Sequence, residues 1–353
     1  MTLTRRTLLA ALAATPLTAR AQGFAGLGTE AEGFALPSRD TRLAFPADHG
    51  PHPAFRIEWW YLTATLEGPD GTPYGVQWTL FRSALAPEAQ GREAKGWGSP
   101  QVWMAHAALT TPEAHHSTER RARGGTGQAG VTATPFSAWI DDWQVTSTAA
   151  TGDALDALRL TASAPDFAYD LALTATGPLV LHGAEGYSVK SPGGQASHYY
   201  SQPFYDLTGT VTLPDRAIPV TGKAWLDREW SSQPLAENQD GWDWISLSFS
   251  SGARLMGFAL RSTDGTAFTS ATWIEPDGTA TAYPDGALTL TPLTEATPPT
   301  RWRVELPDRG VNVEIEALNP RAFMEVSFPY WEGPVSITGS HDGRGYLEMT
   351  GYD

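Results

Sequence analysis

Turn-forming dipeptides cut the chain into short segments, and this feature most constrains its fold. Glycine and proline occur 35 and 27 times, and they fall in turns such as GPDGTP (68–73), SPGG (191–194), EPDG (275–278) and YPDG (283–286). The runs between such turns alternate apolar and polar residues, for example YLTATLE (61–67), LALTATG (171–177) and WISLSFS (244–250). Alternation with period two is typical of β-strands, and many short strands between turns predict a barrel or a sandwich. The sequence therefore predicts an all-β protein built from antiparallel strands.

A weak internal repeat predicts two similar halves. Residues 58–82 and 243–261 both begin with an acid followed by tryptophan, pass a glycine-containing turn and end on arginine. If each copy belongs to its own barrel, the chain divides into an N-terminal barrel over residues 22–215 and a C-terminal barrel over residues 216–353.

The ends of this repeat also predict two ion pairs. In an antiparallel hairpin the first residue of one strand lies beside the last residue of the other. Glu58 should therefore lie next to Arg82, and Asp243 next to Arg261. Partly buried acids are usually paired, so we interpret these four side chains as structural.

The N-terminus resembles an export signal. Arg5 and Arg6 precede an apolar run over residues 8–17, and small residues lead up to Ala21. The run is shorter than the ~20 apolar residues that span a bilayer. We interpret residues 1–21 as a twin-arginine signal peptide cleaved after Ala21, with an ordinary secretory signal or a retained anchor as alternatives. The mature protein should then be periplasmic or secreted.

Charge and composition exclude several classes of function. A net charge of −15 repels phosphate backbones, so nucleic acid is not an expected partner. The chain has no cysteine, which excludes disulfides, thiol catalysis and thiolate metal sites. We find no histidine spacing typical of a metal site, no glycine-rich phosphate loop and no G-x-S-x-G serine motif. We therefore expect neither a metal nor a cofactor. One segment, residues 113–130, is polar, basic and rich in glycine, which predicts a long mobile loop.

The stretch GKAWLDREWSS (222–232) raises the question of catalysis. As an extended segment it places Trp225, Asp227 and Glu229 on one face. Carboxylates beside tryptophans are costly to desolvate unless another group compensates their charge. They are either a general acid and base in an apolar pocket or structural acids paired with arginines, and Arg228 or Glu229 could interact with Asp227 locally.

Seven motifs resemble one known family. They are EWWYLTATL (58–66), QWTLFR (77–82), GYSVK (186–190), SHYYSQP (197–203), GKAWLDREWSS (222–232), GWDWISLSF (241–249) and GRGYLEMTGY (343–352). Together they resemble the AttH-like family, related to carotenoid 1,2-hydratases and hydroxyneurosporene synthases, over about residues 46–352. The resemblance implies two lipocalin-like β-barrels in tandem. Relatives include hydratases acting on isoprenoid double bonds and fungal enzymes that guide a cycloaddition, while many members are labelled secreted hydrolases.

The resemblance also implies part of an active site. Hydratases of this superfamily carry a His-x-aromatic pair and an aromatic-x-Asp pair near the domain junction. Here these positions hold His198 with Tyr200, and Trp225 with Asp227. Both aromatic residues differ in type from those that the hydratases favour, which keeps a π-face but moves or removes a hydroxyl. The acid is the part of the motif that is retained.

The chemistry of hydration fits these residues. Adding water to a trisubstituted alkene needs a proton donor, a cavity that tolerates a tertiary cation and a base for the water. An acid between apolar walls has a raised pKa and can donate at neutral pH, and aromatic faces stabilise a cation by ~0.5–2 kcal/mol each. We assign Asp227 as the acid and His198, beside Tyr200, as the base or water-orienting group. The expected substrate-binding residues are Trp225, Trp230, Trp242, Trp244, Glu229 and His106.

The remaining histidines have simpler interpretations. His106 alternates with apolar neighbours, so it either lines the N-terminal barrel or is a hydrogen-bonded core residue. His115 and His116 fall in the polar segment and should be solvated. His182 and His341 lie beside glycines in expected turns.

Three functions remain open at this point. The first is a cofactor-independent lyase or isomerase acting on an apolar isoprenoid or polyene. The second is a non-catalytic carrier of a lipid or another hydrophobic molecule, since small barrels enclose one such ligand. The third is a carbohydrate-binding or structural module with exposed tryptophans. The first two imply a hydrophobic small molecule as partner and allow peripheral contact with a membrane.

Overall fold

The computed structural model describes residues 31–87 and 96–352. In these ranges the helices are three short 3-10 turns, η2 (Ala47–His49), η3 (Gly96–Gly98) and η4 (Pro307–Arg309). No helix there has the length and apolar character that crossing a membrane requires. The predicted signal peptide, residues 1–21 with cleavage after Ala21, lies outside the described residues.

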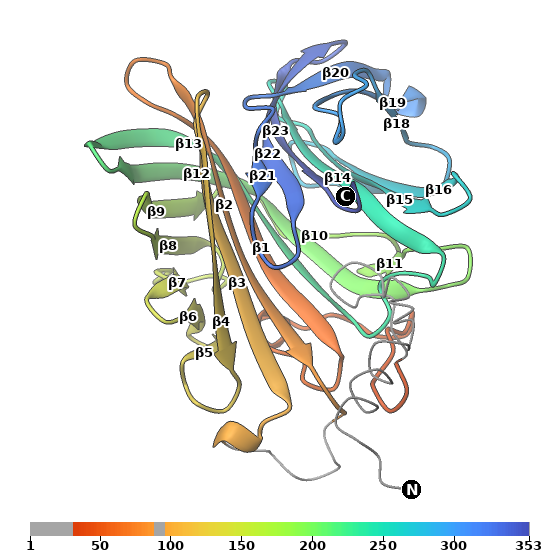
Figure 1. The fold of residues 1–353 in the computed structure, drawn as a ribbon. Helices are drawn as coiled ribbons and strands as arrows, with labels where there is room; N and C mark the ends of the chain where they lie inside the picture. The colour runs from red at the N-terminus through yellow and green to blue at the C-terminus, as the bar shows by residue number, and fades with distance from the viewer. Residues whose placement is uncertain (1–30, 88–95, 353) are drawn as a thin grey trace, which may run out of the picture.

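The first sheet contains 13 antiparallel strands and curls into a near-barrel (Figure 1). Its order is β4 (His115–Arg123), β3 (Gln101–Thr110), β2 (Pro73–Ala84), β1 (Ile57–Glu67), β13 (Arg216–Ser231), β12 (Ala196–Leu213), β9 (Ala168–Ala175), β8 (Ala157–Ser163), β7 (Trp143–Ser147), β6 (Phe136–Ile140) and β5 (Ala129–Ala133). Two short strands, β10 (Val180–Leu181) and β11 (Tyr187–Val189), pair with β12. The end strands β4 and β5 are not neighbours in this order, so the barrel is not closed by a ladder.

The second sheet contains 10 antiparallel strands and forms a half-barrel, drawn in cyan to blue in Figure 1. Its order is β17 (Ala280–Tyr283), β16 (Ala267–Ile274), β15 (Arg254–Ser262), β14 (Gln239–Phe249), β23 (Gly343–Met349), β22 (Tyr330–Gly339), β20 (Val311–Ala317), β19 (Arg301–Leu306) and β18 (Thr289–Pro292), with β21 (Phe323–Met324) paired to β22. The predicted all-β, antiparallel, lipocalin-like fold with two successive parts is therefore confirmed.

The expected division at residues 215 and 216 does not coincide with the change of sheet. Strand β13 pairs with β12 on one side and β1 on the other, so it belongs to the first sheet. The chain passes to the second sheet between Ser231 and Gln239. The expected boundary falls in the tight turn that joins β12 to β13, and both strands of this hairpin belong to the first sheet.

The two predicted hairpins form, with different registers. Glu58 lies directly opposite Arg82 in the β1–β2 pair. In the β14–β15 pair, however, Asp243 lies opposite Ala259, and Arg261 is two residues further along. The short turn between Phe249 and Ala253 sets this register. Arg261 still reaches Asp243, because a long side chain can contact a diagonal neighbour across a ladder.

The predicted mobile loop at residues 113–130 is wrong. Strand β4 covers half of this segment and pairs along its whole length with β3. It is an edge strand, and edge strands tolerate charged side chains that make them look like loops in a sequence. His115 is accordingly half-buried and not fully solvated as predicted. Its Nδ1 hydrogen-bonds the Thr110 hydroxyl at 2.9 Å, and burial lowers the pKa of His115 to about 4.

Side-chain alternation gives the first sheet two buried faces. Trp60 and Leu62 point into the near-barrel core, whereas Tyr61, between them, packs against the second sheet beside Trp244. The two sheets are in tight contact where Gly75 faces Pro334. A Cβ atom at Gly75 would lie only 2.6 Å from Cδ of that proline. The outer wall of the near-barrel is thus also an interface between the sheets.

Candidate active site

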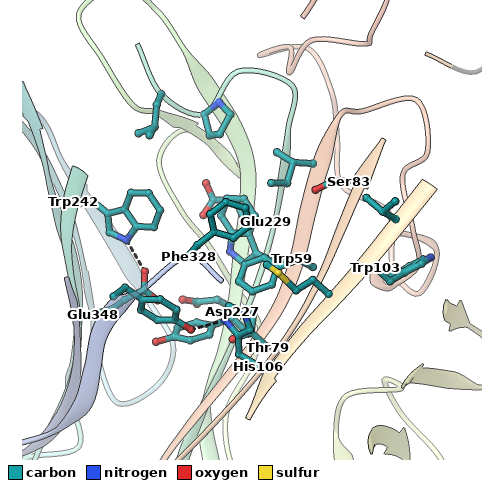
Figure 2. Close-up of a pocket in the computed structure, with 18 of the residues that line it drawn as sticks. Trp59, Thr79, Ser83, Trp103, His106, Asp227, Glu229, Trp242, Phe328 and Glu348 are labelled. Carbon is teal, nitrogen blue, oxygen red and sulfur yellow. Dashed lines mark hydrogen bonds between the residues drawn. The ribbon is translucent and has the colours of Figure 1, made fainter. Parts of the chain in front are cut away.

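A cavity of about 750 Å³ lies between the outer face of the first sheet and the second sheet. Strands β1, β2, β3 and β13 form one wall, and β14, β15, β22 and β23 form the other (Figure 2). The aromatic side chains of its lining include Trp59, Tyr61, Phe81, Tyr199, Trp242, Trp244, Phe258 and Tyr330. Such a space suits an apolar ligand with few polar groups.

Asp227 lies in the wall that the first sheet contributes. The residue is 2% exposed, and its carboxyl group accepts three hydrogen bonds, all from neutral donors. The Tyr199 hydroxyl is 2.8 Å from Oδ2, the Trp225 indole nitrogen is 2.6 Å from Oδ1, and the Ser201 hydroxyl also donates to Oδ1. Burial raises the pKa of Asp227 to about 7, although these donors act in the opposite direction. A carboxyl group of this kind can give up a proton at neutral pH.

A buried histidine supports Asp227 from behind. His182 Nε2 lies 2.6 Å from the Ser201 hydroxyl, and Nδ1 lies 2.9 Å from the Thr272 hydroxyl. Because Ser201 gives its single hydrogen to Asp227, Nε2 must donate to Ser201 and Nδ1 must accept from Thr272. Burial lowers the pKa of His182 to about 3, which keeps the ring neutral, as this arrangement requires. The network fixes the orientation of the acid.

Glu348 lines the same cavity from the second sheet. The Trp242 indole nitrogen donates to its Oε1 at 2.5 Å, as Figure 2 shows. Burial and, to a lesser extent, the charges of Asp227 and Glu229 together raise the pKa of Glu348 to about 7, although the hydrogen bonds that it accepts act in the opposite direction. The cavity therefore holds two carboxyl groups, one from each sheet, that exchange protons near neutral pH.

Glu229 also lines the cavity, but it is ion-paired. Lys190 Nζ lies 2.9 Å from its Oε1, and the Ser197 hydroxyl donates to the same oxygen. The ammonium group lies over the rings of Tyr199 and Phe258, 4.8 and 4.3 Å from their centroids. Because its charge is compensated, Glu229 acts in the wall as half of a cation–carboxylate pair.

His106 connects the two walls. Its Nδ1 lies 3.0 Å from the Tyr330 hydroxyl of the second sheet, and Nε2 lies 3.3 Å from Oε2 of Glu119. Burial lowers the pKa of His106, and Glu119 partly opposes this effect. The sequence predicted that His106 lines the N-terminal barrel or belongs to its core; in the structure it lines the space between the sheets. Among the residues that the structure describes, no group of three or more side chains is arranged to hold a metal ion.

The structure does not bring His198 and Tyr200 together with Asp227. Both point to the opposite face of β12, where the Tyr200 hydroxyl lies 2.7 Å from His49 Nδ1 and the His198 ring lies against Trp230. Trp230 likewise faces away from the cavity. The physical reason is a register shift between Gln202 and Tyr205 in the β12–β13 pair. A shift of one residue exchanges the two faces of a strand, so Tyr199 takes the place beside the acid.

The expected tryptophans fall into three positions. Trp242 and Trp244 line the cavity. Trp225 lies on the same strand face as Asp227 and donates a hydrogen bond to it, but it is not one of the residues that line the cavity. Trp230 stacks on His52 inside the first sheet, with ring centroids 4.0 Å apart. Glu348 was not predicted from the sequence, although alternation along GRGYLEMTGY places that residue on a strand face.

Both expected ion pairs are present. Glu58 is fully buried between Arg82 and Arg228, and these two cations hold the pKa of its carboxyl far below the ordinary range despite burial. Asp243 contacts Arg261 and accepts a hydrogen bond of 2.9 Å from the Tyr352 hydroxyl. Neither acid lines the cavity, which is consistent with structural roles.

Comparison with known proteins places the chain in a family. The sequence pattern of the AttH-like family matches residues 36–352. A crystal structure of an AttH protein from Nitrosomonas europaea superposes with a TM-score of 0.78 at 33% identity, covering 91% of this chain and all of that one.

Two further structures share the fold at low identity. Kievitone hydratase from Nectria haematococca has a TM-score of 0.64 at 14% identity and covers 90% of this chain and 98% of its own. CghA with Sch210972 has a TM-score of 0.54 at 12% identity, covering 92% and 97%. No curated protein matches the sequence.

Proposed function

The chain belongs to the AttH-like family, and on that premise we propose that it is a cofactor-independent hydro-lyase, or an isomerase or cyclase. Its substrate is an apolar isoprenoid or polyene-like molecule held between the two sheets. Asp227 is the proton donor, and Glu348 is the second acid–base group. One observation carries the proposal: a carboxyl group with a pKa of about 7 and only neutral partners lines an aromatic-walled cavity of about 750 Å³.

Every proton and bond in the proposed addition of water can be accounted for with Asp227, Glu348 and one water molecule. The proton of Asp227 moves to one alkene carbon and leaves a positive charge on the other. The oxygen of water bonds to that carbon, and one hydrogen of the water passes to the carboxylate of Glu348. Return of a proton from Glu348 to Asp227 restores the starting state. In a cyclisation a second double bond attacks the cation in place of water, and the new cation then loses a proton to the carboxylate of Glu348.

The walls suit the proposed cation. Trp59, Trp242 and Trp244 present aromatic surfaces to the cavity, and each aromatic face can stabilise a nearby cation by ~0.5–2 kcal/mol. Trp244 is held in place by a hydrogen bond of 3.2 Å to the Tyr199 hydroxyl. The name of one distant structural neighbour, a hydratase, is in keeping with this chemistry, although its identity of 14% supports the fold alone.

The decisive test begins with the ligand. Mature protein is extracted with organic solvent, and the co-purified hydrophobic molecule is identified by mass spectrometry and used as the assay substrate. We expect Asp227→Asn to lower kcat by about 100-fold or more, which is typical for loss of a general acid, while Kd changes only a few-fold. Asp206→Asn removes an exposed carboxylate from the neighbouring strand, where it pairs with Lys223, and should leave both values unchanged. Full turnover by the Asp227 variant would reject the assignment.

A carrier is the second candidate, and the size and apolar walls of the cavity favour it. It predicts a tightly bound hydrophobic molecule that the wild-type protein leaves chemically unchanged. The carbohydrate-binding alternative requires exposed tryptophans. Trp225, Trp230 and Trp244 are only 3%, 2% and 8% exposed, which argues against a sugar platform at these positions.

We also propose that the protein is exported to the periplasm or the medium, where peripheral contact with a membrane supplies the apolar substrate. Support comes from Arg5, Arg6 and the apolar run over residues 8–17. Cell fractionation and N-terminal sequencing should find a mature chain that begins at Gln22. Replacing both arginines with lysine should block export if the route is the twin-arginine one, whereas continued export would indicate an ordinary secretory signal.

A further inference from the structure

A second buried carboxyl group lies directly behind Glu348. Glu332 on β22 is the cross-strand partner of Glu348 on β23. Directly opposed residues of an antiparallel pair have Cβ atoms about 5 Å apart. Glu332 is 1% exposed, and its hydrogen-bond partners are the neutral hydroxyls of Tyr61 and Tyr330. A buried carboxylate without a cation beside it is costly, whereas a neutral carboxylic acid is much less so.

The hydroxyl of Tyr61 links these two acids. It hydrogen-bonds Oε1 of Glu332 and also Glu348. A phenol has a single hydrogen to donate, so it can donate to only one of the two carboxyl groups. The other carboxyl group must carry a hydrogen and donate it to the phenol oxygen. This arrangement therefore favours one protonated acid in the cluster.

The surroundings decide which acid keeps its proton. Burial and the charge of Glu348 raise the pKa of Glu332 well above its ordinary value. Glu348 lines the cavity, where its pKa is about 7. Apart from Glu348, the titratable groups whose electrostatics couple to Glu332 are all tyrosines: Tyr61, Tyr330, Tyr346 and Tyr169. Two like charges so close together cannot both ionise easily, so the pair loses its protons in two separate steps.

We propose that Glu332, Tyr61 and Glu348 form a buried proton chain in which Glu332 stays a neutral acid and Glu348 is the member that ionises. Glu332 donates to the phenol oxygen of Tyr61, and Tyr61 in turn donates to the carboxylate of Glu348. Glu332 and Tyr61 are positioning residues, because they orient and stabilise the base form of Glu348. The link to catalysis rests on the proposed function. The existence of the buried proton chain does not.

Carboxyl titration tests this chain without a substrate. Protein labelled with ¹³C at the glutamate side-chain carboxyl is titrated by NMR from pH 4 to pH 10. We expect one signal that stays in the protonated position at pH 9 and is missing from Glu332→Gln. In Glu348→Gln the opposing charge is gone, so the pKa of the retained signal should fall by about one unit or more. Tyr61→Phe should shift both signals.

Controls keep the result interpretable. Glu316→Gln removes an exposed carboxyl from the neighbouring strand β20 and should leave the protonated signal in place. If Glu332→Gln does not fold, the shift in Glu348→Gln carries the test. A wild-type protein in which every glutamate is ionised at pH 8, or a retained signal that Glu348→Gln does not move, would overturn the proposal. Because the titration needs no ligand, it can verify the proton chain even if the protein proves to be a carrier.

Discussion

Asp227 gives the protein a stability that depends on pH in a defined direction. Its pKa rises from 3.8 in the unfolded chain to about 7 in the folded protein, so the folded state binds more protons between these values. The free energy of unfolding should therefore fall as pH rises from 4 to 7, by roughly a few kcal/mol. Above pH 7 this contribution is constant.

Asp227→Asn provides the measurement. The variant lacks this titration, so at pH 8 it should be more stable than wild type, and near pH 4 the two should be similar. Urea unfolding at both pH values gives the difference. A variant less stable than wild type at pH 8 would show that the carboxylate is favourably held, contrary to its raised pKa.

Glu58 is a buried acid whose pKa is lowered, in contrast to that of Asp227. It has the cations of Arg82 and Arg228, and the Arg228 guanidinium also lies 3.8 Å from the ring centroid of Trp60. Arg228→Met would leave a buried charge with half its compensation, which typically costs ~3–5 kcal/mol. Arg344→Met breaks an exposed pair with Glu67 and should cost no more than ~1 kcal/mol. Similar losses in urea unfolding would contradict this difference.

At the scale of elements, strands β1 and β13 meet where Gly222 has no room for a side chain. A Cβ atom there would lie 2.9 Å from Cα of Leu66 and still closer to the Thr65 carbonyl. Gly222→Ala should therefore destabilise the protein by ~1–3 kcal/mol, the usual cost of overpacking. Gly98→Ala, at a position with open space around it, is the control and should lie within about 0.5 kcal/mol of wild type. Chemical unfolding would measure both.

The sequence predicted the elements better than the faces they present. Turn dipeptides and alternation indicated the strands, and the ends of the repeat indicated the pairing of Glu58 with Arg82. The side of β12 that faces Asp227 was not predictable, because the register shift near Gln202 depends on packing between strands and leaves no pattern in the sequence. Glu348 was missed for another reason: it lines a cavity only because the first sheet lies opposite its strand, which local periodicity does not report.

At the scale of the whole molecule, we expect the tight contact between Gly75 and Pro334 to set the distance between the two sheets. Gly75→Ala would push Cβ into the proline ring and should cost ~1–3 kcal/mol while weakening ligand binding. Pro334→Ala removes the obstructing ring atoms, so the double variant should recover most of the loss. A double-mutant cycle in urea measures this coupling, and additive effects would mean that the two residues do not set the spacing.

The placement of the cavity outside the near-barrel has a consequence for how such proteins diversify. One wall carries the acid Asp227 with its fixed donors, and the facing wall is built by a separate stretch of chain that contributes Trp242, Trp244 and Phe258. Trp242 and Trp244 in that facing wall hydrogen-bond Glu348 and Tyr199, whereas Phe258 and Leu260 on β15 line the cavity without such a bond. Directed evolution confined to β15 should therefore change ligand preference while the proposed acid–base pair is kept.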